Sequence, residues 1–125
     1  MEAYVDYEFY ADIYEGKLEE DDFFESVIKA TAHVRRITFG RADFYVDRDE
    51  VKLATCAVCD VIAAEKKKRT ANKGMLVSSE NSDGYSVSYV SELESGESAE
   101  ELLNRKAYKA SEVFLTPTGL LDWGL

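Results

Sequence analysis

Two cysteines three positions apart, Cys56 and Cys59, have a spacing that suits redox or metal chemistry. A structural zinc site needs four ligands, and the single histidine, His33, would add only a third. The pair is expected in the middle of a helix with no strand before it, which does not suit a redox motif. We therefore interpret both cysteines as small residues of the packing, and we expect no metal and no cofactor.

Other candidates for catalysis have simpler interpretations. His33 shares its expected helix face with Ser26, Lys29 and Arg36, so we expect a solvated side chain and not a catalytic base. Acidic residues gather at 19–22 and 92–101, where a glycosidase or a metal site could use them. Acidic residues also favour helix starts, which explains both clusters. No nucleophile or phosphate-loop motif is present, and we expect no catalytic residues.

The composition is acidic and limits the partners of the protein. Asp and Glu number 25 against 15 Lys and Arg, giving a net charge of −10 and a pI near 4.6. Such a charge opposes non-specific binding to nucleic acid or anionic lipid. A hydrophobic fraction of 46% and 15 aromatic residues suffice for the core of one domain. We expect no membrane span and no secretory signal, and hence a cytoplasmic protein.

Hydrophobic periodicity predicts a mainly α-helical domain over 1–125, with about four helices. The predicted helices cover 7–14, ended by Gly16; 19–38, ended by Gly40; 49–69; and a last helix from the capping box at Ser98 to Pro117. In the second helix, Phe24, Ile28 and Thr31 widen the apolar stripe formed by Phe23, Val27, Ala30, Val34 and Ile37. The third helix is apolar nearly all round, which is typical of burial from several sides.

Two segments of the chain depart from the helical pattern. Residues 75–90 alternate around an Asp-Gly turn and predict an inserted β-hairpin, and 116–125 form a short apolar tail. The basic run 66–69 is interpreted as a helix end, with two alternatives: a nucleic-acid patch, or a contact with acids of a neighbouring protein such as residues 19–22 of another copy.

Three features would leave apolar surface uncovered in a monomer. They are the helix that is apolar nearly all round, the hairpin without a partner strand, and the apolar tail. Self-association would cover all three. The alternative is that the other helices cover the third helix, the hairpin is a loop, and the tail folds back on the core.

The chain resembles the head-tail connector, or head-completion adaptor, proteins of tailed bacteriophages and prophages. The resemblance is carried by the tyrosine-rich opening 4–14, Ile37-Thr38-Phe39-Gly40-Arg41, Glu50-Val51-Lys52-Leu53-Ala54 with Cys56 and Asp60, the hairpin stretch 79–89, and Thr118-Gly119-Leu120-Leu121 with Trp123-Gly124-Leu125. It implies a non-enzymatic helical protein that forms a ring of about twelve copies beneath the portal. The ring would extend the DNA channel and join the head to the next connector or tail protein.

The resemblance also implies a location and a set of contact residues. The protein would occupy the head-tail junction of the virion, after assembly in the host cytoplasm. DNA would pass an acidic wall without specific binding. The expected portal-binding residues are Thr118, Gly119, Leu120, Leu121, Trp123 and Leu125, and the expected inter-subunit or channel residues of the hairpin are Asp83, Gly84, Tyr85, Val87 and Tyr89.

Two other functions remain open from the sequence. A small acidic binding module, such as a regulator that mimics DNA charge, would stay monomeric or dimeric and bind a basic partner in a salt-sensitive way. A thiol-dependent enzyme would lose its activity when Cys56 and Cys59 are both replaced by alanine.

Overall fold

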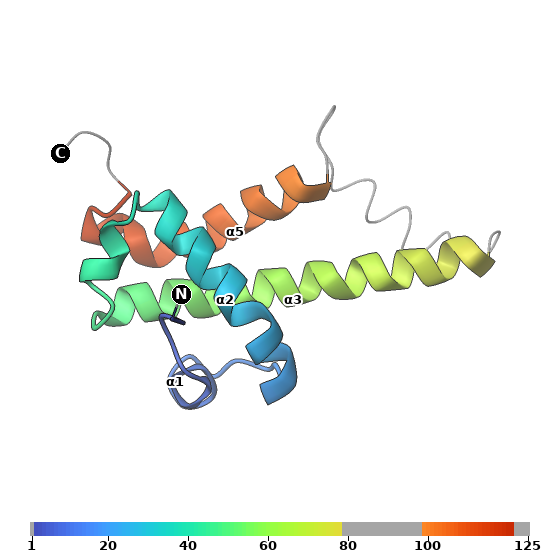
Figure 1. Ribbon diagram of the computed structural model, residues 1–125, viewed down its shortest axis with the longest axis horizontal. Coiled ribbons are helices and arrows are strands. Elements are labelled where there is room, and N and C mark those ends of the chain that lie inside the picture. Colours follow the sequence, from blue (N-terminus) through green and yellow to red (C-terminus); the bar gives the residue numbers. More distant parts are fainter. Residues whose placement is uncertain (1, 79–98, 122–125) are drawn as a thin grey trace.

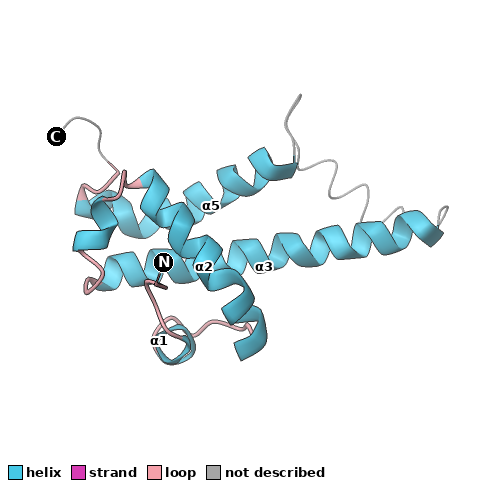
Figure 2. Ribbon diagram, viewed as in Figure 1, coloured by secondary structure: helices cyan, strands magenta, loops and turns pink. Residues whose placement is uncertain are grey.

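The computed structural model describes residues 2–78 and 99–121. The elements along the chain are α1 (Tyr7–Asp12), α2 (Glu20–Ile37), the short 3-10 helix η1 (Arg41–Phe44), α3 (Asp49–Ser78), α5 (Ala99–Leu115) and the 3-10 turn η2 (Thr116–Thr118). No strand occurs in these described ranges, and Figure 2 shows short loops joining the helices from α1 to α3. The prediction of a mainly α-helical fold is confirmed.

The long helix α3 is the axis of the molecule, and the other elements pack along its first two thirds (Figure 1). At 1.5 Å per residue its 30 residues span about 45 Å. Both α2 and α5 lie against it, and α1 contacts α2 and α3 from the opposite side to α5 in this view. None of the helices in the described ranges is long and apolar enough to cross a bilayer.

Burial of α3 from several directions explains its composition. Val51, Ala54 and Val58 are fully buried, and so are Cys56 and Cys59 on neighbouring faces. Small side chains allow α2 and α5 to approach closely on different sides. The expectation that this helix is covered from more than one side is therefore confirmed within one chain.

Helix α2 follows the predicted stripe only in part. Phe23, Val27 and Val34 are buried, and acidic residues begin the helix while Arg35 and Arg36 end it, as the helix dipole favours. The prediction that the stripe extends to Phe24 and Ile28 is wrong, because these side chains are 56% and 45% exposed.

Helix α3 continues nine residues beyond the predicted end at 69, up to Ser78. The interpretation of 66–69 as a helix end is therefore wrong. The sequence that follows contains no proline, and alanine, lysine, methionine and leucine all favour helix, so one glycine at 74 does not stop it.

The same finding moves the start of the predicted hairpin. Residues 75–78 are helical, so the hairpin does not begin at 75. The rest of that prediction lies outside the described residues, together with its contact residues Asp83, Gly84, Tyr85, Val87 and Tyr89.

Candidate interaction surfaces

The tyrosine-rich opening is bound to α3 through one carboxylate. The hydroxyl of Tyr10 donates to one oxygen of Asp60 at 2.6 Å, and that of Tyr14 donates to the other at 2.9 Å. The Leu18 amide donates to the Tyr10 hydroxyl at 3.0 Å. Burial, followed by the neighbouring carboxylate, raises the pKa of both phenols, so they remain proton donors at any physiological pH.

A second carboxylate fixes the first residues of the chain. The Tyr4 amide donates to Thr31 Oγ1 on α2 at 3.0 Å, and the Tyr4 hydroxyl donates to Asp43 of η1. Arg35 forms an ion pair with the same carboxylate at 2.9 Å. The Tyr4 hydrogen bond and the Arg35 guanidinium hold the pKa of Asp43 below its ordinary value.

An open groove lies between this N-terminal segment, α2 and the connection from η1 to α3. Its volume is about 1080 Å³. Apolar side chains of Phe9, Phe24, Ile28 and Val46 are part of its lining. We name it the acidic groove, because four carboxylates and only two cations also line it; the carboxylates are Glu2, Asp6, Asp43 and Asp47.

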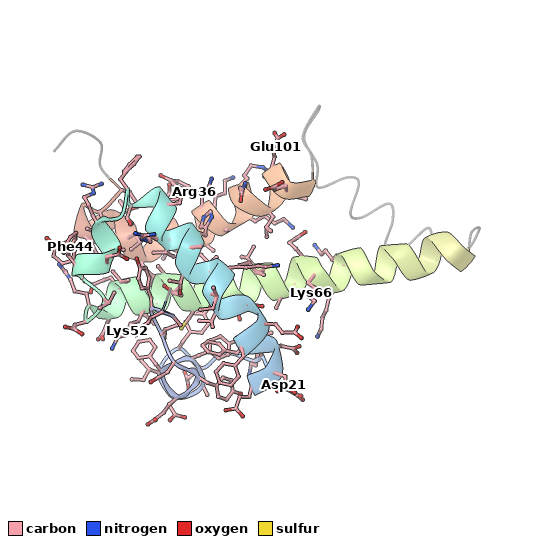
Figure 3. The ribbon with its side chains drawn as sticks, in the orientation of Figure 1. Asp21, Arg36, Phe44, Lys52, Lys66 and Glu101 are labelled. Carbon is pink, nitrogen blue, oxygen red and sulfur yellow. The ribbon has the colours of Figure 1, made fainter. Side chains whose placement is uncertain are left out.

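Large apolar side chains are also exposed at the turn between α2 and α3. Phe44 is 84% exposed, Phe39 is 53% exposed and Tyr45 is 44% exposed. Figure 3 shows Phe44 at the end of the molecule that is opposite to the C-terminal end of α3. Phe39 has a φ of 57°, a left-handed conformation that costs about 1 kcal/mol or more for a side chain with a Cβ. We name Phe39, Phe44 and Tyr45 the aromatic turn.

The predicted portal-binding residues divide between the core and the part of the chain that is not described. Leu120 is only 6% exposed, and Leu121 packs against the core. Thr118 Oγ1 donates to the Leu115 carbonyl at 2.6 Å and accepts from the Leu120 amide at 3.1 Å, while Gly119 has a left-handed φ of 77°. Trp123 and Leu125 lie outside the described residues.

The two cysteines are placed as the sequence predicts. Both thiols are free and their residues have no exposed surface. Burial raises the pKa of Cys56 to about 12, and that of Cys59 rises further for the same reason. Neither thiol forms a thiolate at neutral pH, which is the form that thiol chemistry requires. In the described ranges, no three His, Cys, Asp or Glu side chains are grouped to hold a metal ion.

His33 does not lie in solvent, so that prediction is wrong. The residue is 8% exposed, and Arg36 contacts its Nδ1 at 3.1 Å. Its Nε2 has no hydrogen-bond partner among the described residues. Burial, followed by the Arg36 charge, lowers the pKa of His33 to about 4. The polar helix face in the sequence gave no sign of this burial, because tertiary packing decides which faces of a helix are covered.

Ion pairs within the chain join α3 to α2 and to α5. Lys66 forms an ion pair with Glu25 of α2, and Lys106 of α5 donates to the buried Glu65 at 2.8 Å. Figure 3 shows Lys66 beside the middle of α3 and Asp21 at the exposed start of α2. The alternative in which residues 66–69 contact residues 19–22 of another copy stays a prediction, although Lys66 already has an intrachain partner.

A comparison of the chain with protein-family models, curated proteins and solved structures finds no match in any of the three. Function therefore has to be inferred from the acidic groove, the aromatic turn and the motifs that the fold brings together. Sequence reasoning missed the acidic groove and the aromatic turn. Phe24 and Ile28 fitted the helical period of a core stripe, and Phe39 stood beside the glycine that ends the helix.

Proposed function

We propose that this protein is a structural adaptor of a tailed phage or prophage that forms a ring of about twelve copies beneath the portal. The ring extends the DNA channel and carries the next connector or tail protein. The aromatic turn is the observation that supports this proposal most strongly. Exposed aromatic side chains at one end of a small domain are typical of an interaction surface.

Phe39 adds a second kind of support. Its left-handed backbone destabilises the single chain, and its ring stays 53% exposed although the Arg41 guanidinium lies 5.9 Å from the ring centre. Such a residue is expected where contact with a partner compensates its cost in the monomer. A neighbouring subunit in a self-associating protein would provide this contact.

Two motifs of the resemblance meet in space, which is also consistent with the proposal. Arg41, in the segment 37–41, bonds to the carbonyl of Leu120, in the segment 118–121. The tyrosine-rich opening meets Asp60, another residue of the resemblance. These residues are thus in contact with one another within the fold.

Native mass spectrometry of the purified protein, alone and with the portal protein of the same genome, tests the proposal. We expect a closed ring, or monomers that add stoichiometrically to the portal ring. Phe44→Ser should leave the melting temperature unchanged, because that side chain is 84% exposed, and should reduce assembly. Lys109→Ser, an exposed change on α5, serves as the matched control.

A monomer that ignores the portal at low salt would overturn the adaptor function. The acidic binding module would then become the leading interpretation. For such a module we expect binding to a basic protein, with an affinity that falls steeply as salt is added.

A further inference from the structure

The acidic groove runs along α2. The Tyr4 amide donates to Thr31 in α2, and the Tyr7 ring lies 5.4 Å from the ring of Phe23 near the start of α2. The segment before α1 therefore runs antiparallel to α2 and forms the second wall of the groove, and Figure 1 shows this path from the N-terminus to α1. The lining residues of α2 extend from Phe23 to Arg35, which is about 18 Å of helix. The groove is thus long enough for about three turns of a partner helix.

Apolar surface is exposed along this length. Phe24 and Ile28 lie one turn apart on α2 and are 56% and 45% exposed. Phe9 of α1 and Val46 before α3 are half-buried and line the same groove. Removal of this apolar surface from water would favour the binding of an apolar partner.

Carboxylates carry the unbalanced charge of the groove. Both of its cations are engaged inside the chain, since Arg35 pairs with Asp43 at 2.9 Å and Lys52 lies 5.3 Å from the centre of the Phe9 ring. Two exposed carboxylates have no hydrogen bond or ion pair with the described residues, namely Glu2 and Asp47. An occupant therefore meets negative charge, which lysine or arginine side chains would complement.

Other occupants match this charge less well. Nucleic acid and anionic lipid have the same sign of charge as the groove. Residues 79–98 include five acids and no lysine or arginine, and residues 122–125 include one acid and no base. A second copy would bring a net charge of −10 to an acidic surface. The complementary occupant is a basic segment of a different protein.

We propose that the acidic groove binds an amphipathic helix of a partner protein, with apolar side chains on one face and lysine or arginine beside them. The apolar side chains would pack on Phe24 and Ile28, and the cations would lie near Glu2 and Asp47. Insertion of an amphipathic helix into an apolar groove is a common mode of recognition. No residue of the aromatic turn lines the groove, so this site does not depend on the proposed ring.

A synthetic peptide tests the site on the full chain. The probe is a fluorescein-labelled peptide of about 14 residues, with leucine at the helical period and lysine elsewhere. Fluorescence anisotropy at low salt should show saturable binding. One control peptide has glutamate in place of lysine, and the other has serine in place of leucine. Each should bind at least about tenfold more weakly, because the first loses the charge attraction and the second loses the apolar burial.

Variants of the protein test the two components of the groove separately. Ile28→Ser should weaken peptide binding by about five- to tenfold, because it removes an apolar contact. Its matched control is Val113→Ser, since Val113 is 71% exposed and lies outside the groove. Asp47→Asn should weaken binding by about threefold at low salt, whereas Asp12→Asn removes the same charge from an exposed site outside the groove. Phe24→Ser replaces Ile28→Ser if the latter is poorly folded.

Amide chemical shifts locate the bound peptide. The amides of residues 24–28 and 46–47 should shift most, because these residues belong to or adjoin the lining of the groove. Shifts at these residues, together with weaker binding by the groove variants and not by their controls, support the site. Absence of binding, or equal losses for Asp47→Asn and Asp12→Asn, overturns it. If Ile28→Ser dissociates an oligomer of the protein alone in sedimentation, the occupant is a second copy and the proposal is wrong.

Discussion

Arg41 joins the two ends of the fold, since its Nη2 donates to the main-chain carbonyl of Leu120 at 2.5 Å across 79 positions of sequence. Its Nε donates to the Thr38 carbonyl at 3.0 Å. One guanidinium thus gives a hydrogen-bond donor to a carbonyl at the end of α2 and links the segment after α5 to η1. Leu120 is 6% exposed, so part of the predicted tail belongs to the core.

Two truncations should therefore behave differently. Removing 116–125 takes Leu120 and Leu121 from the core, and we expect a loss of about 3 to 5 kcal/mol in the free energy of unfolding. Removing only 122–125 keeps Leu120 and Leu121 in place, so we expect a smaller loss. Circular dichroism with urea unfolding measures both. If removal of 116–125 is harmless, the placement of Leu120 in the core is wrong.

The shorter truncation also tests the expected portal contact. Under the proposed function, Trp123 and Leu125 are the portal-binding residues outside the buried segment. The variant without 122–125 should fold and fail to add to the portal ring. Normal addition would exclude these residues from the contact and would leave the fold interpretation intact.

The Tyr10 hydroxyl is expected to contribute strongly to stability. Tyr10→Phe removes a 2.6 Å bond to Asp60 and the acceptor of the Leu18 amide, so we expect a loss of about 2 kcal/mol. Tyr14→Phe removes one bond, at 2.9 Å, and should cost about 1 kcal/mol. Tyr108→Phe, at a partly exposed site, should be nearly neutral. Equal effects of the Tyr10 and Tyr108 variants in urea unfolding would contradict this role.

The Tyr10 ring needs the space that the missing side chain of Gly16 leaves. A Cβ at this position would lie 2.0 to 2.4 Å from atoms of the Tyr10 ring. Gly16→Ala should displace the ring, weaken its bond to Asp60, and destabilise the protein by about 2 kcal/mol. Gly40→Ala meets no atom within 4 Å and tests only its φ of 78°, so a cost near 1 kcal/mol is expected. A melting temperature for Gly16→Ala at or above that of Gly40→Ala would contradict this packing role.

The sequence predicted the helices well because their signals are local. The stripe of Phe23, Val27 and Val34 and the glycine at 40 place α2 to within a residue at each end. The end of α3 was misplaced because a basic run favours the C-terminus of a helix but does not stop one. Stopping requires a residue such as proline, and the sequence after 69 lacks it until Pro117.

The surfaces could not be predicted because they depend on contacts between distant residues. His33 looks polar and solvated on its own helix, yet tertiary packing buries it. Phe24 has the period of a core residue and is nevertheless 56% exposed, because it lines the open acidic groove. Helical period gives the relative orientation of side chains, but the neighbours of each face are set by the whole chain.

Burial of neutral His33 should make stability depend on pH. The unfolded chain binds a proton at this residue below its ordinary pKa of 6.5, whereas the folded protein binds it only near a pKa of about 4. The stabilisation is complete above pH 6.5 and is lost as the pH falls toward 4. Between pH 7 and 4.5, the wild type should lose on the order of 2 kcal/mol more than His33→Gln in urea unfolding. Parallel pH profiles would show that His33 is not buried neutral.

Glu65 is expected to make Lys106 important for folding. The Glu65 side chain is 3% exposed; its Oε1 accepts from Lys106 at 2.8 Å and lies 3.9 Å from Lys68. Its Oε2 has no hydrogen-bond partner in the described ranges. Lys106→Met removes the nearest positive charge from a buried carboxylate, and we expect a loss of about 3 kcal/mol in unfolding free energy.

The double variant distinguishes a buried charge from a lost contact. Glu65→Leu with Lys106→Met replaces the pair by apolar groups of similar volume, so most of the stability should return. Lys66→Met is the control, because its partner Glu25 is 57% exposed and water can replace the lysine. If the double variant is as unstable as Lys106→Met alone, the cost comes from packing of the lysine stem between α3 and α5 and not from an unpaired carboxylate.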